Sequence, residues 1–188
     1  MKTYVDKDGV ELGATEPKPD FTGQYSYRGK VRIHHIDYEW FDVPSKKDLP
    51  DLPWQQVYMV GNLNGSIPLV RYEEDPDNLP GGGTEPGETV EETARREAIE
   101  ELNCKVSGWE PLGYQANYEN GHFIGYQLRI YAKLDKLGVF VTDPGGPVIG
   151  QRYISIDQLA VELKWPKTGQ RLQELAKKYF IKSSYKSH

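Results

Sequence analysis

The sequence predicts a mixed α/β (α+β) fold, a sandwich in which strands lie between helices. Two pairs of β-rich segments are each joined through an Asn-Gly dipeptide, at residues 64–65 and 120–121, the strongest short-range sign of a β-hairpin. Two other stretches, 90–102 and about 168–180, have the composition or the periodicity of helices. The chain has 188 residues, 37% of them apolar, which suits one domain with a sizeable core.

Composition and charge narrow the class of protein. The net charge of −5 argues against a dedicated surface for nucleic acid or for an anionic membrane. The only cysteine, Cys104, has no partner for an internal disulfide, and its position directly after a helix suggests a small buried side chain. The N-terminus lacks the apolar core of a signal peptide, and no run is long enough to span a membrane. We therefore expect a cytoplasmic protein that binds neither nucleic acid nor membrane.

The N-terminal part of the chain is predicted to be an extension of the main domain. Residues 1–20 are polar and proline-containing, which favours a loose arm. Residues 21–43 are rich in aromatic and β-branched side chains, so we expect one or two strands with a turn near Gly29. The predicted divisions are a β-rich extension over 1–50, a main domain over 51–182 and a frayed tail over 183–188.

The two hairpins account for most of the predicted sheet. The first spans residues 54–73. The second joins 109–118 to 123–134, and the latter arm alternates between apolar and polar side chains, which indicates a half-buried antiparallel strand. The side chains on its apolar face are Ile124, Tyr126, Leu128, Ile130 and Ala132.

The C-terminal part combines a strand with helical segments. Residues 153–159 are predicted to form a strand that leads into a helix, with Ser155 and Gln158 as a capping box at the junction. The last helix, over about 168–180, has apolar side chains at helical spacing, which predicts a stripe that packs onto the sheet. This stripe comprises Leu172, Leu175, Ala176 and Tyr179.

The helix at 90–102 is predicted from its ends as well as its composition. Thr89 and Glu92 form a capping box, in which each side chain satisfies a backbone N–H at the start of the helix. Asn103 follows the last helical position, where a residue with left-handed backbone often ends a helix, and asparagine tolerates that conformation well.

Three carboxylates, Glu97, Glu100 and Glu101, crowd one face of this helix. Like charges three or four residues apart cost on the order of 0.2–0.5 kcal/mol per pair, and the helix dipole disfavours anions near the C-terminal end. No lysine follows within the helix to relieve them. A solvated acidic face is the general explanation of such a pattern. The glycines at 81–83 favour instead a site for a hard cation, because Mg²⁺ and Mn²⁺ prefer oxygen ligands.

The glycine loop and the helix together contain a spaced set of residues: Gly82, Glu88, Arg96, Glu97, Glu100 and Glu101. This set resembles the Nudix box, G-x5-E-x7-R-E-U-x-E-E-x-G-U, where U is a bulky aliphatic residue, and the resemblance covers residues 82–104. Asn103 replaces the final glycine, and Ala98 and Cys104 are small for aliphatic positions. The resemblance implies the Nudix fold, a mixed sheet between helices.

The resemblance also implies an activity, the hydrolysis of a nucleoside diphosphate linked to another group, with Mg²⁺ or Mn²⁺. Glu97, Glu100 and Glu101 would bind the metal together with the backbone carbonyl of Gly81. A glutamate of the box, Glu97 or Glu100, or an acid from another loop would accept the proton of the attacking water, with Arg96 orienting a box glutamate. Gly82 and Glu88 would be structural.

One departure from the family leaves a second function open. Many relatives have one or two further glutamates just before the later strand that leads into the C-terminal helices, but the corresponding residues 147–153 contain no acid, and the nearest one is Asp143. The identity of the catalytic base is therefore not determined. The alternative is a non-catalytic Nudix-like module that binds a nucleotide or metabolite.

The substrate is less determined than the family. Tyr114, Tyr118 and Tyr126 could stack on a nucleobase, although with thirteen tyrosines in the chain the interpretation as aromatic side chains of the sheet and core is favoured. Around residues 119–122 the chain lacks the proline of ADP-sugar hydrolases and the tyrosine of dinucleoside polyphosphate hydrolases. A small nucleotide, either a nucleotide sugar such as ADP-ribose or a nucleoside triphosphate, is the expected substrate. The N-terminal β-rich region resembles strands that ADP-ribose hydrolases use to form homodimers.

Overall fold

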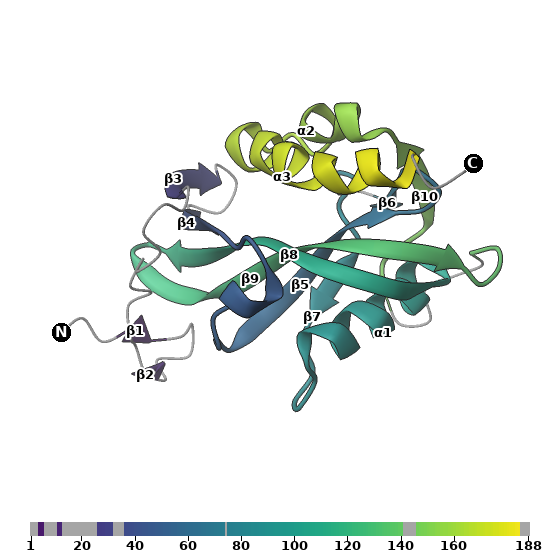
Figure 1. The fold of residues 1–188 in the computed structure, drawn as a ribbon. Coiled ribbons are helices and arrows are strands. Elements are labelled where there is room, and N and C mark those ends of the chain that lie inside the picture. The colour runs from purple at the N-terminus through teal and green to yellow at the C-terminus, as the bar shows by residue number, and fades with distance from the viewer. Residues whose placement is uncertain are drawn as a thin grey trace.

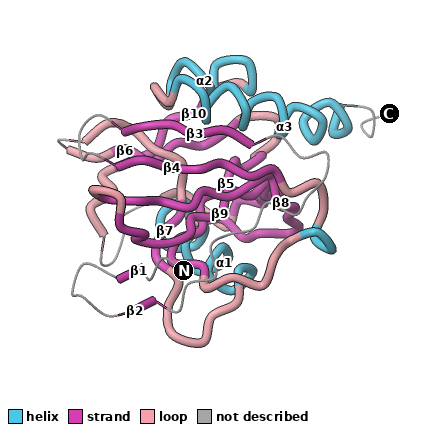
Figure 2. The backbone as a smooth tube through the Cα atoms, turned by 90° about the vertical axis from the view of Figure 1, so that its left-hand side faces the viewer, coloured by secondary structure: helices cyan, strands magenta, loops and turns pink. Residues whose placement is uncertain are grey.

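The computed structural model describes residues 4–5, 11–12, 26–31, 36–73, 75–140 and 146–184. These residues form three layers, with α1 (Val90–Leu102) on one face of a mixed sheet and α2 (Leu159–Glu162) with α3 (Pro166–Ser184) on the other (Figure 1). Figure 2 shows the same layers from a second direction. The prediction of an α/β sandwich with a mixed sheet is confirmed.

The main sheet has six strands among the described residues, in the order β3-β4-β8-β9-β5-β7. All neighbouring pairs are antiparallel except β5 and β9, which are parallel and make the sheet mixed. The strands are β3 (Ser26–Val31), β4 (Ile36–Asp42), β8 (Cys104–Glu119), β9 (His122–Lys136), β5 (Trp54–Asn62) and β7 (Gly81–Gly83).

Smaller elements complete the fold. β6 (Ile67–Arg71) pairs with β10 (Gly150–Ile154), and β1 (Tyr4–Val5) pairs with β2 (Glu11–Leu12), both antiparallel. Two short 3₁₀ helices are η1 (Lys46–Asp48) and η2 (Ile156–Gln158). No helix among the described residues is long and apolar enough to cross a membrane.

The first predicted hairpin is correct at its turn and wrong in its pairing. Asn64 and Gly65 have φ angles of 53° and 90°, as this turn requires, and Leu63 bridges Ser66. Beyond this bridge β6 leaves β5 and pairs with β10 instead. β5 itself pairs along its length with β9 and, at Gln56–Tyr58, with β7.

The second predicted hairpin is confirmed as β8 and β9, with Asn120 and Gly121 at positive φ in the turn. The prediction that its second arm is half-buried is wrong. Arg129 and Tyr131, on the face expected to be polar, are only 4% and 8% exposed, because helices cover both faces of the sheet at this strand.

The prediction of one or two strands within residues 21–43 is confirmed by β3 and β4, but the turn was not located correctly. Gly29 lies inside β3 opposite Tyr38, so the turn is not at Gly29 itself. β4 pairs along the central strand β8, which makes this region continuous with the main sheet. The predicted arm, apart from β1 and β2, the end of the predicted tail and Asp143 lie outside the described residues.

The core occupies both sides of the sheet. On the α1 side, Ala94 and Ala98 pack with Met59 and Leu128. On the α3 side, Leu172, Ala176 and Phe180 pack with sheet residues such as Trp40. The buried Leu172 and Ala176, with Leu175 and Tyr179 partly buried beside them, confirm the predicted stripe. Burying one leucine side chain stabilises the fold by about 1.5–3 kcal/mol.

Candidate functional site

The glycine strand β7 is held at the edge of the sheet by close backbone contacts. Gly81 has a φ of 140°, and a Cβ there would meet the Val57 carbonyl and lie 2.7 Å from Tyr58 Cα. A Cβ on Gly82 would meet Glu97 Oε1 and lie 2.9 Å from Glu97 Cδ. Gly81 is therefore required by its backbone conformation and its close approach to β5, whereas a Cβ on Gly82 would displace the carboxylate of Glu97.

Both predicted ends of α1 are confirmed. The Thr89 N–H donates to Glu92 Oε2 at 2.8 Å, and the Glu92 N–H donates to Thr89 Oγ1 at 3.3 Å. Asn103 adopts the left-handed conformation, with φ 49° and ψ 46°. Asn103 stands where the box pattern has glycine, and it still adopts the left-handed backbone that this position requires.

Arg96 lies at the centre of the box and joins its loop to its helix. Its Nε and Nη2 donate to the two oxygens of Glu88 at 2.8 and 3.0 Å, and Nη2 also donates to the Gly83 carbonyl at 2.7 Å. Its Nη1 donates to Glu97 Oε1 at 2.8 Å and to Glu100 Oε2 at 3.1 Å. The repulsion between the crowded carboxylates is thus relieved by an arginine of the same helix. The sequence prediction considered only a lysine that would follow them.

Glu88 is fixed by several donors at once. Besides Arg96, the Thr93 hydroxyl donates to Glu88 Oε2 at 3.0 Å and the Glu85 N–H donates to it at 2.9 Å. The hydrogen bonds from Arg96 are the main reason that the pKa of Glu88 is lowered to about 2. Such a carboxylate is ionised throughout the physiological pH range, and its contacts tie the glycine loop to the helix.

The three helix carboxylates are not equivalent. Glu97 and Glu101 are each only 7% exposed, whereas the side chain of Glu100 is 40% exposed. Glu101 Oε2 accepts the Gly81 N–H at 2.7 Å, which fixes the end of α1 against β7. Two carboxylates are therefore held against the glycine strand, and the third lies at the surface beside Arg96.

The donor set has the chemistry of a Mg²⁺ or Mn²⁺ site, since every side-chain ligand offered is a carboxylate oxygen. The missing Cβ of Gly82 leaves room for the Glu97 carboxylate beside the strand. Within the described residues, however, no three His, Cys, Asp or Glu side chains are already gathered around one point. Arg96 holds Glu97 and Glu100 in the present arrangement, so a metal would require Glu100 to turn away from it.

Two of the three tyrosines considered for base stacking lie in the core. Tyr114 is 2% exposed and stacks on Phe41 with ring centroids 4.9 Å apart, and Tyr126 is 5% exposed at 6.1 Å from Tyr114. Burial raises the pKa of Tyr114 to about 12. Tyr118 is partly exposed, and its hydroxyl lies 3.5 Å from Glu39. This arrangement favours the interpretation as core and sheet aromatics, and a contact with substrate remains a prediction.

Sequence reasoning missed Gln151. This residue of β10 donates through Nε2 to the Glu101 carbonyl at 2.8 Å, so an amide from the acid-free segment 147–153 lies against the box helix. Its side chain carries no charge that could replace the missing glutamate. The contact has no local signal in the sequence, because it arises from the placement of β10 after a long separation along the chain.

Sequence reasoning also missed Tyr58 and Arg129. Tyr58 pairs with Gly81 across the β5–β7 ladder, and the Arg129 guanidinium lies over its ring at 4.6 Å. Burial raises the pKa of Tyr58, and the charges of Glu101 and Glu97 raise it further against the opposing effect of Arg129. The hydroxyl therefore lies within electrostatic reach of the box carboxylates. Tyr58 lies on β5 and Arg129 on β9, two strands that become neighbours only in the folded sheet.

Comparison with known proteins agrees with this geometry. The NUDIX domain profile matches residues 52–175, more than half of the chain. No curated protein sequence matches the chain. Among solved structures, the chain is similar to a mutant of the Bacillus subtilis pyrophosphohydrolase BsRppH, with 20% identity and a TM-score of 0.64, over 81% of this chain and 97% of that chain. It is also similar to an ADP compounds hydrolase, with 16% identity and a TM-score of 0.54, over 85% of this chain and 93% of that one. These neighbours show the shared fold, and the domain profile shows that the chain belongs to the NUDIX family of hydrolases, as residues 82–104 predict.

Proposed function

We propose that the protein hydrolyses a nucleoside diphosphate linked to another group, by attack of water on the pyrophosphate, with Mg²⁺ or Mn²⁺. The observation that supports this most directly is the burial of Glu97 and Glu101 against the glycine strand, at 7% exposure each, with Arg96 and the Gly81 N–H holding them in place. Buried like charges are costly. A role in binding a cation explains why the helix keeps them.

The metal ligands in this proposal are Glu97, Glu100 and Glu101, with the Gly81 carbonyl. When bound, the metal would neutralise charge on the diphosphate and lower the pKa of a bound water. Arg96 positions Glu97 and Glu100 through its Nη1, and Glu100 is exposed enough to exchange this contact for a ligand role.

The remaining steps belong to side chains and backbone of the box. A carboxylate, Glu97 or Glu100, would accept the proton of the attacking water, because 147–153 has no acid for this task. Arg96 and the loop carboxylate Glu88 keep the glycine strand close to the helix, as their hydrogen bonds indicate.

The substrate class proposed is a small nucleotide, either a nucleotide sugar such as ADP-ribose or a nucleoside triphosphate. The two structural neighbours are named as a pyrophosphohydrolase and an ADP compounds hydrolase, which is consistent with diphosphate cleavage and does not select between these substrates. A homodimer formed through residues 1–50 remains a prediction.

The first experiment measures product release from ADP-ribose, ADP-glucose, diadenosine polyphosphates and nucleoside triphosphates, with Mg²⁺, with Mn²⁺ and with EDTA. We expect metal-dependent turnover of one class and its loss in Glu101→Gln, because the amide can still accept the Gly81 N–H but no longer offers a charged ligand. The matched control is Glu91→Gln on the same helix, where Glu91 pairs with Arg95 at the surface, and it should retain turnover.

The alternative function is a non-catalytic module that binds a nucleotide or metabolite. Gln151, in the segment where relatives have glutamates, supports this alternative, since an amide cannot act as a general base. Tight binding of one member of the panel without any turnover, in both metals, would select it over the hydrolase.

A further inference from the structure

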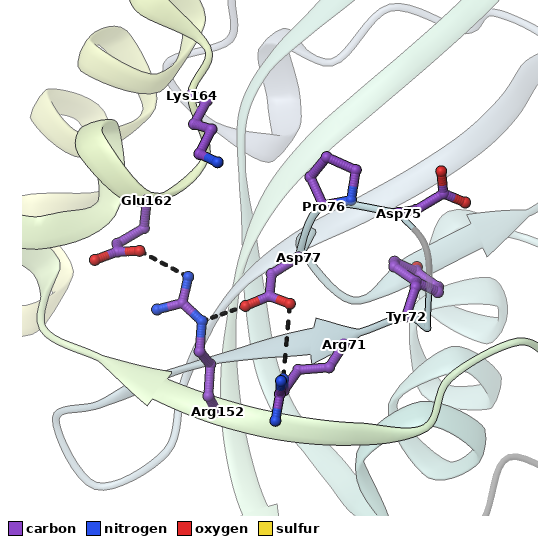
Figure 3. Close-up of a pocket in the computed structure, with 8 residues that line it drawn as sticks. All are labelled: Arg71, Tyr72, Asp75, Pro76, Asp77, Arg152, Glu162 and Lys164. Carbon is purple, nitrogen blue, oxygen red and sulfur yellow. Dashed lines mark hydrogen bonds and ion pairs between the residues drawn. The ribbon is translucent and has the colours of Figure 1, made fainter.

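A second polar pocket lies apart from the Nudix box. Its volume is about 320 Å³, which is in the range of small-molecule sites. Its described walls come from β6, Tyr72 and residues 75–77, β10 and the end of α2, and none of them belongs to 81–104 (Figure 3). The pocket is therefore a different site from that proposed for hydrolysis, and what it binds can be inferred from its own side chains.

Arg152 is the fixed cation of this pocket. Its Nε donates to Asp77, and its Nη2 donates to Glu162 Oε2 at 2.7 Å, so two acids from different segments hold one guanidinium (Figure 3). The hydrogen bond with Asp77 is the main reason that the pKa of Arg152 is raised. A guanidinium restrained in this way loses little side-chain entropy when a ligand binds.

Two further cations face the same space with weaker restraint. Arg71 Nε lies 3.9 Å from Asp77 Oδ1, beyond hydrogen-bond distance, and its side chain is 55% exposed. Lys164 follows α2 and extends toward the space bounded by Glu162, Asp77 and Pro76 (Figure 3). Within the described part of the chain, Lys164 makes neither an ion pair nor a side-chain hydrogen bond.

Lys164 and Arg71 make no side-chain hydrogen bond within the described residues, so their N–H donors are available to a ligand. Among the described residues, its lining has three basic side chains and three acidic ones. Two of the acids, Asp77 and Glu162, already accept hydrogen bonds from Arg152. A lysine offers three N–H donors and an arginine five, whereas ionised acids only accept. A ligand rich in acceptors would match the donors of Lys164 and Arg71.

We propose that this pocket binds a small phosphorylated molecule, with its phosphoryl group in contact with Lys164 and Arg152, and with Arg71, which lies across Asp77 from Lys164, beside the attached group (Figure 3). The planar fork of arginine matches the oxygens of a phosphoryl group, and lysine binds the same group as a point charge. The pocket has room for more than the phosphoryl group, so part of the attached molecule would enter it. Because the described lining has equal numbers of basic and acidic side chains, the affinity depends on directed hydrogen bonds, and salt weakens it only modestly.

The test is isothermal titration calorimetry of the full chain in EDTA, with orthophosphate, ribose 5-phosphate and AMP as separate ligands. We expect binding of the phosphorylated compounds and none of adenosine or ribose. Equal affinity for all three would show that the phosphoryl group alone is recognised, and tighter binding of ribose 5-phosphate or AMP would show that the attached group contributes. Both results support the proposal.

Variants locate the binding. Lys164→Gly should weaken it about tenfold, the loss expected for one charge-assisted hydrogen bond, and Lys164→Arg should retain most of the affinity. Lys164 has a φ of 54°, which glycine adopts readily, so Lys164→Gly should fold. Lys105→Ala removes the same charge from an exposed position on β8 and should leave the affinity unchanged.

A second control separates this pocket from the box. Glu101→Gln should bind orthophosphate and AMP as the wild type does, because Glu101 does not line the pocket. The proposal is wrong if no phosphorylated ligand binds at millimolar concentration, or if neither Lys164→Gly nor Arg71→Ala alters binding. It is also wrong if Glu101→Gln abolishes binding, which would assign the ligand to the box.

Discussion

Arg96 and Arg152 each join two or more carboxylates, but the two clusters differ in origin and in charge. Arg96 contacts Glu88, Glu97 and Glu100, all within one loop and helix. Arg152 joins Asp77 and Glu162, which come from segments on either side of it in the sequence. The first cluster is local and the second exists only because the chain folds back on itself.

The difference in charge between the two clusters indicates ligands of opposite charge. Around Arg96 the carboxylates outnumber the single cation, so the cluster retains negative charge that a divalent metal could balance. Among the described residues around Arg152, the basic and acidic side chains are equal in number, and the acids already hold that arginine. The same residue type thus supports a proposed cation site in one place and a proposed phosphoryl site in the other.

The largest effect that would test this contrast is expected from Gly82→Ala. A Cβ there would displace the Glu97 carboxylate, and a misplacement of about 1 Å in a catalytic site costs roughly 10²-fold in rate. We expect kcat/KM for the substrate found in the panel to fall by about that factor, with the melting temperature showing that the protein still folds. Gly83→Ala is the matched control, since its Cβ would come no closer than 3.8 Å to the Gln55 carbonyl. Equal losses in the two variants would contradict a specific role for Glu97.

A smaller effect concerns the pH dependence of stability. The pKa of Glu88 is lowered from 4.5 to about 2 in the folded protein, so its contribution is fully present above the unfolded value and is lost as pH falls through this interval. Glu88→Gln should lower the free energy of unfolding at neutral pH by about 1 kcal/mol. It should also flatten the loss of stability between about pH 5 and pH 2. Urea denaturation at a series of pH values measures both, and parallel curves for the two proteins would contradict the role of Glu88.

The smallest expected effect compares the left-handed residues of the two regions. Lys164 has a φ of 54° without a compensating side-chain contact in the described structure, so Lys164→Gly should stabilise the protein by about 0.5 kcal/mol. Asn103 has a similar φ of 49°, but its Nδ2 donates to the Val139 carbonyl at 3.0 Å. Asn103→Gly should therefore bring no gain. Thermal unfolding of both variants checks this, and a loss of stability in Lys164→Gly would show that its side chain supports the fold.

Elements that depend on neighbouring residues were predictable from the sequence. The capping box of Thr89 and Glu92, the left-handed Asn103 and the two Asn-Gly turns all appear as expected. The segment 82–104 likewise identified the family, because the box places its residues on one loop and one helix. Each of these features is set by contacts between residues close in sequence, where backbone preference and side-chain reach leave few alternatives.

Features that depend on distant segments were decided only by the tertiary structure. The sequence contains no sign that β6 would leave β5 for β10, that Gln151 would contact the Glu101 carbonyl, or that Arg129 would be buried beside Tyr58. The pocket around Arg152 belongs to the same group, since its walls meet only after β10 and α2 pack near β6. The sequence by itself therefore determined the family and the local form of the box. The sheet order and the helix packing, which depend on competition among many possible long-range pairings, determined which other side chains surround it.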